Sequence, residues 1–194
     1  VQGFTYYTDI NNVPQKKYDF VVLMNVLHEI DIDDWKRVFR NIYNALKDDG
    51  MLLFVETNRL TIGEQPYCKN GFLVLDENQI KELFKTTNTI CSGDIEARNS
   101  KSHCCLIPKR FLNNVDNDSI NRAIRDLARE TFRKLEKYNE RRHELLDNKK
   151  AVDEQTTREY AYYSQLYINA MLVMKDKKRF PDTPYEKIAD FFDL

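Results

Sequence analysis

Two titratable side chains lie shortly after one apolar run of the sequence, and a third closes a second run. His28 and Glu29 come just after residues 18–24. Glu56 closes the apolar residues 51–55. An imidazole exchanges a proton near neutral pH, and a neighbouring carboxylate can orient it. His28, Glu29 and Glu56 are therefore the candidate catalytic residues; the alternative for His28 is packing or hydrogen bonding at the start of the next helix.

The elements around these side chains predict a parallel sheet that gathers them at one edge. Residues 18–24 are nearly all apolar, which is typical of a strand covered on both faces. A helix is predicted over residues 32–46, with Asp31 as its N-cap and Gly50 in a left-handed conformation after its end. Residues 51–55 form the next strand. In such sheets ligands bind beyond the carboxyl ends of the strands, which is where the candidate residues lie.

The rest of the chain predicts a helix, a β-hairpin and two long helices. The helix covers residues 76–85, and the two strands of the hairpin cover 90–97 and 102–108. This order of elements argues for an α/β fold with a mostly parallel sheet and an antiparallel edge. Apolar residues then recur at helical spacing over 118–147 and again over about 152–178, which predicts a helical hairpin.

We divide the chain into an α/β region, residues 1–112, and a helical extension, residues 113–194. A short strand is expected at residues 4–7, and a short last helix near the C-terminus of the sequence. The tyrosine-rich part of the second long helix, residues 160–174, is apolar nearly all round. Such a helix buries more than one face, so we expect it to pack in the core or at a dimer interface rather than to contact a ligand.

Composition excludes several classes of protein. Thirty basic and 31 acidic residues give a net charge of −1, so nucleic acid and anionic membranes are not favoured as partners. No apolar run is long enough for a membrane span. The four cysteines form no CxxC motif, which favours reduced thiols in a cytoplasmic protein and no metal site. The five glycines lie too far apart for a phosphate-binding loop.

In order and spacing, these elements resemble the second half of a class I S-adenosylmethionine-dependent methyltransferase. Residues 18–24 resemble the fourth strand of that family, and residues 52–56 resemble its fifth strand. The strands predicted over 90–97 and 102–108 resemble its terminal antiparallel hairpin. The resemblance implies a Rossmann-like sheet, S-adenosylmethionine as the cofactor, and transfer of its methyl group to an oxygen or nitrogen of an acceptor.

The resemblance also implies which residues meet the cofactor. Asp9 and Ile10 resemble the acidic motif after the family's third strand, whose carboxylate faces the adenine, although an aspartate in a turn fits the same position. Asn25 lies in the loop after the fourth strand. Val26 follows it instead of the proline found in many enzymes that methylate amino groups of DNA or protein. His28 is placed like the histidine of small-molecule O-methyltransferases, which deprotonates the acceptor hydroxyl.

The family's first strand and its Gly-rich loop have no counterpart in the sequence. We therefore expect an incomplete sheet, the C-terminal part of a larger methyltransferase, which binds the cofactor only with a missing N-terminal segment supplied in cis or by a partner chain. A homodimer through the C-terminal helices is a further expectation. The alternative is a non-catalytic, methyltransferase-like module that binds a partner or a second copy through its helical hairpin.

Overall fold

The computed structural model describes residues 5–59, 72–86, 91–97, 100–176 and 178. Its elements, in chain order, are the 3₁₀ turn η1 (Ile10–Asn12), β1 (Tyr18–Met24), the 3₁₀ turn η2 (Leu27–Glu29), α1 (Ile32–Ala45), β2 (Leu46–Thr57), α2 (Glu77–Phe84), β3 (Cys91–Ala97), β4 (Ser100–Pro108), α3 (Lys109–Leu112), α4 (Asn117–Asp147) and α5 (Glu154–Met174). The predicted last helix lies outside the described residues.

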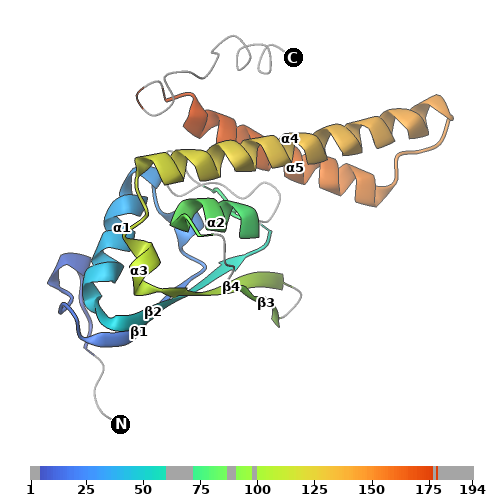
Figure 1. Cartoon of the computed structure of the whole chain (residues 1–194). Helices are drawn as coiled ribbons and strands as arrows, with labels where there is room; N and C mark the ends of the chain where they lie inside the picture. The colour runs from blue at the N-terminus through green and yellow to red at the C-terminus, as the bar shows by residue number, and fades with distance from the viewer. Residues whose placement is uncertain (1–4, 60–71, 87–90, 98–99, 177, 179–194) are drawn as a thin grey trace.

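Four strands form one mixed sheet in the order β1-β2-β4-β3. β1 and β2 are parallel, and β4 is antiparallel to both of its neighbours. The prediction of an α/β sheet with an antiparallel edge is confirmed, but the described sheet is not mostly parallel, because only one of its three strand pairs is parallel. All of the labelled helices lie on the same side of this sheet in Figure 1.

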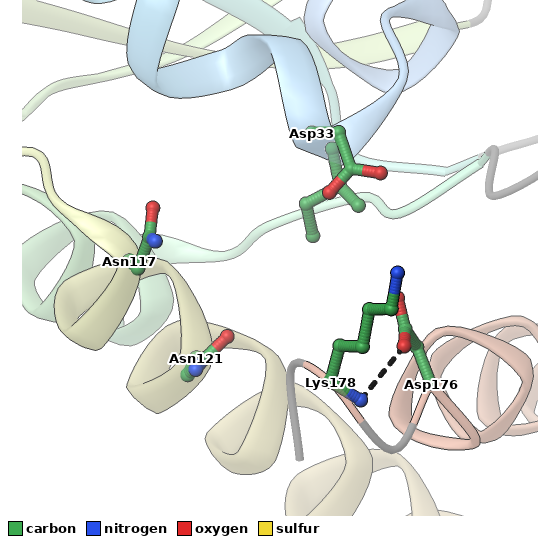
Figure 2. Close-up of a pocket in the computed structure, with 6 residues that line it drawn as sticks. Asp33, Asn117, Asn121, Asp176 and Lys178 are labelled. Carbon is green, nitrogen blue, oxygen red and sulfur yellow. Dashed lines mark hydrogen bonds between the residues drawn. The ribbon is translucent and has the colours of Figure 1, made fainter.

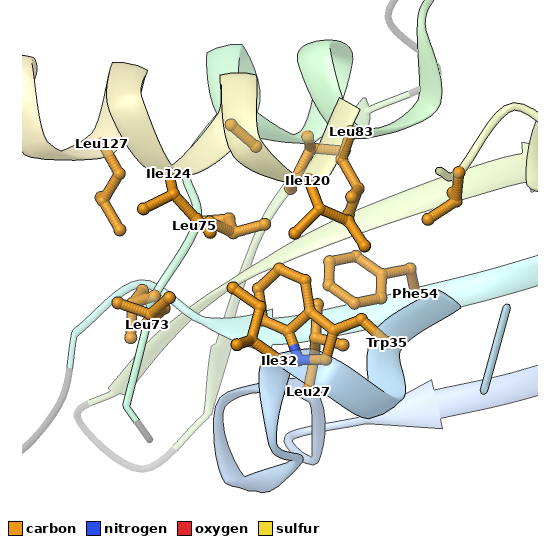
Figure 3. Close-up of a cluster of buried hydrophobic side chains, with 14 of the residues drawn as sticks. Leu27, Ile32, Trp35, Phe54, Leu73, Leu75, Leu83, Ile120, Ile124 and Leu127 are labelled. Carbon is orange, nitrogen blue, oxygen red and sulfur yellow. The ribbon is translucent and has the colours of Figure 1, made fainter. Parts of the chain in front are cut away.

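The core lies between that side of the sheet and the helices. Trp35 of α1 and Phe54 of β2 are fully buried there, and Leu73 and Leu75 pack beside them from the segment before α2. Figure 3 shows Ile120, Ile124 and Leu127 of α4 pointing into the same cluster. The α/β region and the helical extension therefore share one hydrophobic core.

The opposite face of β1 is uncovered in the part of the chain that the structure describes. Phe20, Val22 and Met24 alternate along the strand and are 61%, 55% and 54% exposed. Val21 and Leu23, on the other face, pack against the core. The prediction that this strand is covered on both faces is therefore wrong for the described residues. Three large apolar side chains on one strand face form a patch of the kind that marks an interaction surface.

The helical hairpin begins at a well-formed N-cap. The Asp116 side chain accepts a hydrogen bond from the Ser119 backbone N–H at 2.8 Å, and the Ser119 hydroxyl pairs with the Asp116 backbone N–H at 3.0 Å. α4 then runs for 31 residues, about 46 Å at the helical rise. α5 returns along it and buries Tyr162, Leu166 and Ala170. Within the described residues, no helix has the length and apolar character that crossing a membrane requires.

Gly50 does not end a helix, so that prediction is wrong. α1 stops at Ala45, Leu46 is already extended, and β2 begins there. A side chain at position 50 would place its Cβ 3.0 Å from Cδ2 of Leu46 and 3.0 Å from the carbonyl oxygen of Lys47. A side chain at this position would require its neighbours to shift by a few tenths of an ångström, because the chain folds closely on itself where β2 bulges. The prediction of a strand at residues 4–7 is also wrong, because the described residues 5–7 are not part of any strand.

We expect Asp116→Ala to lower the free energy of unfolding by about 1 kcal/mol at neutral pH, because the first turn of α4 loses its cap. A hydrogen bond from Lys85, at 2.6 Å, and the Ser119 backbone N–H lower the pKa of Asp116. A lowered pKa stabilises the folded state above the usual aspartate pKa and ceases to do so as the pH falls through the lowered value.

The difference in the free energy of unfolding between wild type and Asp116→Ala should therefore become smaller in acid. Urea unfolding at several pH values measures this difference. Asp118→Ala, at a more exposed carboxylate in the same turn, is the matched control and should change stability by less. Equal effects of the two variants would contradict a capping role for Asp116.

Candidate active site at the carboxyl ends of β1 and β2

Parallel pairing brings the ends of β1 and β2 to one edge of the sheet. Met24 lies opposite Val55 in the register, and the Asn25 backbone N–H donates to the Val55 carbonyl at 2.8 Å. The chain then turns through η2, while the next residue of β2 is Glu56. His28 of η2 thus faces Glu56 although 28 residues separate them in the sequence.

His28 and Glu56 form a buried pair, here called the dyad. The Nδ1 atom of His28 lies 2.5 Å from Oε1 of Glu56, and the two residues are 7% and 1% exposed. Glu56 also accepts backbone N–H groups, from Leu27 at 3.0 Å on Oε2 and from Thr57 at 3.1 Å on Oε1. A buried carboxylate is stable only when donors of this kind surround it.

The dyad defines which nitrogen of His28 can act as a base. An ionised carboxylate only accepts hydrogen bonds, so Nδ1 carries the proton that lies between His28 and Glu56. The neutral imidazole then has its lone pair on Nε2. Glu29, which is half-exposed, places Oε1 3.8 Å from this second nitrogen. The arrangement suits proton transfer at Nε2, with Glu56 offsetting the positive charge of the imidazolium.

Local interactions hold the turn that carries His28. The indole Nε1 of Trp35 donates to the Ile30 carbonyl at 3.0 Å, which ties the end of the turn to α1. Asp31 caps α1 through the Asp33 backbone N–H at 2.9 Å, as predicted. The ring of Phe72 stacks on the imidazole with centroids 5.5 Å apart and an angle of 24° between the planes.

The predicted cofactor residues do not all meet at this edge. Asn25 lies there, in a left-handed conformation at φ 49°, which asparagine tolerates better than most residues. Asp9 and Ile10 lie at the other end of β1, because Asn41 near the end of α1 donates to Asn11 of the same turn at 3.4 Å. Asp9 caps that turn through the Asn11 backbone N–H. A cofactor contact for any of the three stays a prediction.

None of the predicted site residues lines the cavity drawn in Figure 2. The pocket in Figure 2, about 490 Å³, lies between the start of α1, the start of α4 and the end of α5. Asp33, Asn117, Asn121 and Asp176 line it, with Lys178 beside Asp176. Among the residues that the structure describes, no group of three or more His, Cys, Asp or Glu side chains could hold a metal ion.

Phe72, which stacks on the His28 ring, was not predicted from the sequence as a residue of this site. Its backbone N–H also donates to the His28 carbonyl at 3.0 Å, and its own carbonyl accepts from Nδ2 of Asn169 in α5 at 3.2 Å. The signal for Asn169 is in the sequence: it is an amide within the otherwise largely apolar run of α5. No comparable signal marks Phe72, because nothing local reveals that residues 28 and 72 meet.

A sheet of this order with polar groups at the carboxyl ends of its parallel strands is typical of a Rossmann-like domain. A family model described as a methyltransferase domain matches residues 1–118, more than half of the chain. The chain belongs to this methyltransferase domain family, which confirms the resemblance described above.

A crystal structure assigned as a type 11 methyltransferase from Sulfolobus solfataricus is similar to the chain at 20% identity and a TM-score of 0.39. The match covers 53% of this chain and 56% of that one, so the chain spans little more than half the length of this relative. No curated protein matches the chain significantly.

We expect Glu56→Gln to lower the free energy of unfolding by about 1–3 kcal/mol, since the new amide directs a buried N–H group at the donors that surround Glu56. Urea unfolding at neutral pH measures the change. Glu29→Gln is the matched control, because Glu29 is half-exposed at the same turn and should change stability by less than about 0.5 kcal/mol. Similar losses in both variants would contradict the assignment of Glu56 as the buried anchor.

Proposed function

We propose that this methyltransferase domain transfers a methyl group from S-adenosylmethionine to an oxygen or nitrogen of a small acceptor, with His28 as the general base. The observation that carries the proposal is the buried dyad at the carboxyl edge of the parallel strands. A histidine held by a buried carboxylate is suited to taking a proton from a hydroxyl or ammonium group as it becomes a nucleophile.

S-Adenosylmethionine, when bound, supplies an electrophilic methyl group. The chain's own residues act on the acceptor. Nε2 of His28 takes the proton of the attacking group, while Glu56 keeps Nδ1 protonated and stabilises the imidazolium that results. Glu29, at the exposed rim of the turn, can orient the acceptor or His28. Positioning and exclusion of water supply the rest of the rate enhancement.

The described residues fit the acceptor side of such a site better than the whole cofactor. Asn25 lies at the edge where the dyad lies, and it can offer an amide to a ligand there. The sequence has no Gly-rich loop whose backbone N–H groups could hold the carboxylate end of the cofactor. Asp9 and Ile10 lie at the far end of β1 from this edge. We therefore propose that a further segment shares in cofactor binding.

The uncovered face of β1 supports this second part of the proposal. Parallel strands are normally covered on both faces, yet Phe20, Val22 and Met24 are more than half exposed. A segment that packs on these side chains, from a longer form of this protein or from a partner chain, would stand next to Asn25. It could bring the missing cofactor contacts to the edge that holds the dyad.

We expect His28→Ala to lower the rate of methyl transfer by about 10²–10⁴-fold in the completed protein, because a general base contributes about that much. The measurement is release of S-adenosylhomocysteine with a panel of small hydroxyl and amine compounds. Cofactor affinity should stay near that of the wild type, and Glu29→Gln should have a smaller effect. An unchanged rate would remove His28 from the mechanism, and absence of turnover in the wild type would favour the interaction module.

Residues 1–194 alone should bind S-adenosylmethionine weakly, because the contacts at the carboxylate end are missing. Calorimetric titration of the cofactor into this chain measures the affinity. Adding the segment that covers Phe20, Val22 and Met24 should raise the affinity, and Val22→Glu should prevent that gain by placing a charge in the contact. Tight cofactor binding by the chain alone would overturn the need for a further segment.

A further inference from the structure

Phe72 connects the helical hairpin to the candidate base. Phe72 donates its backbone N–H to the His28 carbonyl at 3.0 Å, and its carbonyl accepts a hydrogen bond from Nδ2 of Asn169 at 3.2 Å. Its ring lies on the imidazole of His28, and the residue is only 2% exposed. Both backbone polar groups of Phe72 and its side chain are thus used in one connection between α5 and η2.

The backbone of Phe72 is held in a conformation that it would not adopt unaided. Its φ of 56° lies in the left-handed region, which is unfavourable for a bulky residue other than glycine. Such a conformation persists only when the surrounding contacts determine it. The contacts that determine it here come from His28 on one side and from Asn169 on the other. Strained positions of this kind cluster at functional sites.

We infer that Asn169 is a positioning residue for His28, acting through Phe72. Glu56 holds the imidazole of His28 at Nδ1. Phe72 stacks on the face of the same ring and bonds to the His28 backbone carbonyl. Loss of the Asn169 amide would leave the Phe72 carbonyl without this donor and release the left-handed turn. The helical extension then serves the candidate site as well as the core. The catalytic meaning of this role rests on the function proposed above.

The test is the hydrogen-bonded Nδ1 proton of His28, observed by ¹H–¹⁵N NMR of the chain without any cofactor. The chain has three histidines, so the signal can be assigned by its absence in His28→Gln. Asn169→Asp keeps the shape of the side chain and removes the donor; Asn169→Ala removes both. Ser164→Ala is the matched control, since the Ser164 hydroxyl bonds to the Tyr160 carbonyl within α5.

We expect exchange of this proton with solvent to become about fivefold faster or more in both Asn169 variants, the effect of losing one hydrogen bond. Ser164→Ala should leave it unchanged, and Phe72→Leu should act like the Asn169 variants. Thermal unfolding checks that each variant is folded. If Asn169→Ala does not fold, Asn169→Asp still provides the test. Unchanged exchange in a folded Asn169 variant, or an equal change in Ser164→Ala, would overturn the inference.

This measurement is independent of methyl transfer. Should His28→Ala leave turnover unchanged while the Asn169 variants disturb the Nδ1 proton, the proposed function fails and the positioning of His28 stands. If the Asn169 variants leave exchange of the Nδ1 proton unchanged while His28→Ala abolishes turnover, the inference fails and the proposed function stands.

Discussion

The buried carboxylate of Glu56 is the constraint on which the candidate site depends. An ionised carboxylate with 1% exposure is stable only if donors replace the water it has lost. Leu27, His28 and Thr57 supply those donors, and two of the three belong to the turn that follows β1. The parallel pairing of β1 with β2 is what brings that turn to Glu56. A shift in this register would leave the carboxylate uncompensated, so the sheet and the dyad stabilise each other.

The turn that supplies donors to Glu56 is itself held in place by contacts with the helices, including the C-terminal extension. η2 is held by Trp35 from α1 and by Phe72 from the segment before α2, and Phe72 is held in turn by Asn169 of α5. α4 packs into the core cluster beside Leu73 and Leu75, which follow Phe72 closely in the chain. The helical hairpin is therefore part of the structure that carries the site, although it follows the last strand of the sheet.

Most elements could be predicted from sequence because their signals are local. An apolar run defined β1 to the residue, a capping aspartate located the start of α1, and helical spacing located α4. Glu56 and His28 could be placed together because both lie near the carboxyl ends of parallel strands. Gly50 was wrongly assigned to the end of a helix. Glycine suits both a left-handed turn and a close approach to another residue, such as Leu46, and the sequence does not distinguish the two.

Under the proposed function, the uncovered face of β1 would link the stability of the domain to its chemistry. Burying Phe20, Val22 and Met24 would remove most of the exposed apolar surface of one strand, and each such side chain contributes about 1.5–3 kcal/mol when it is fully buried. A segment that covered them, as proposed above, would lie along β1, which ends at Met24, just before the chain turns at Asn25 toward the dyad. Such a contact on this face of β1 would therefore also order the edge at which the cofactor and the acceptor are proposed to meet. Its strength would limit cofactor binding.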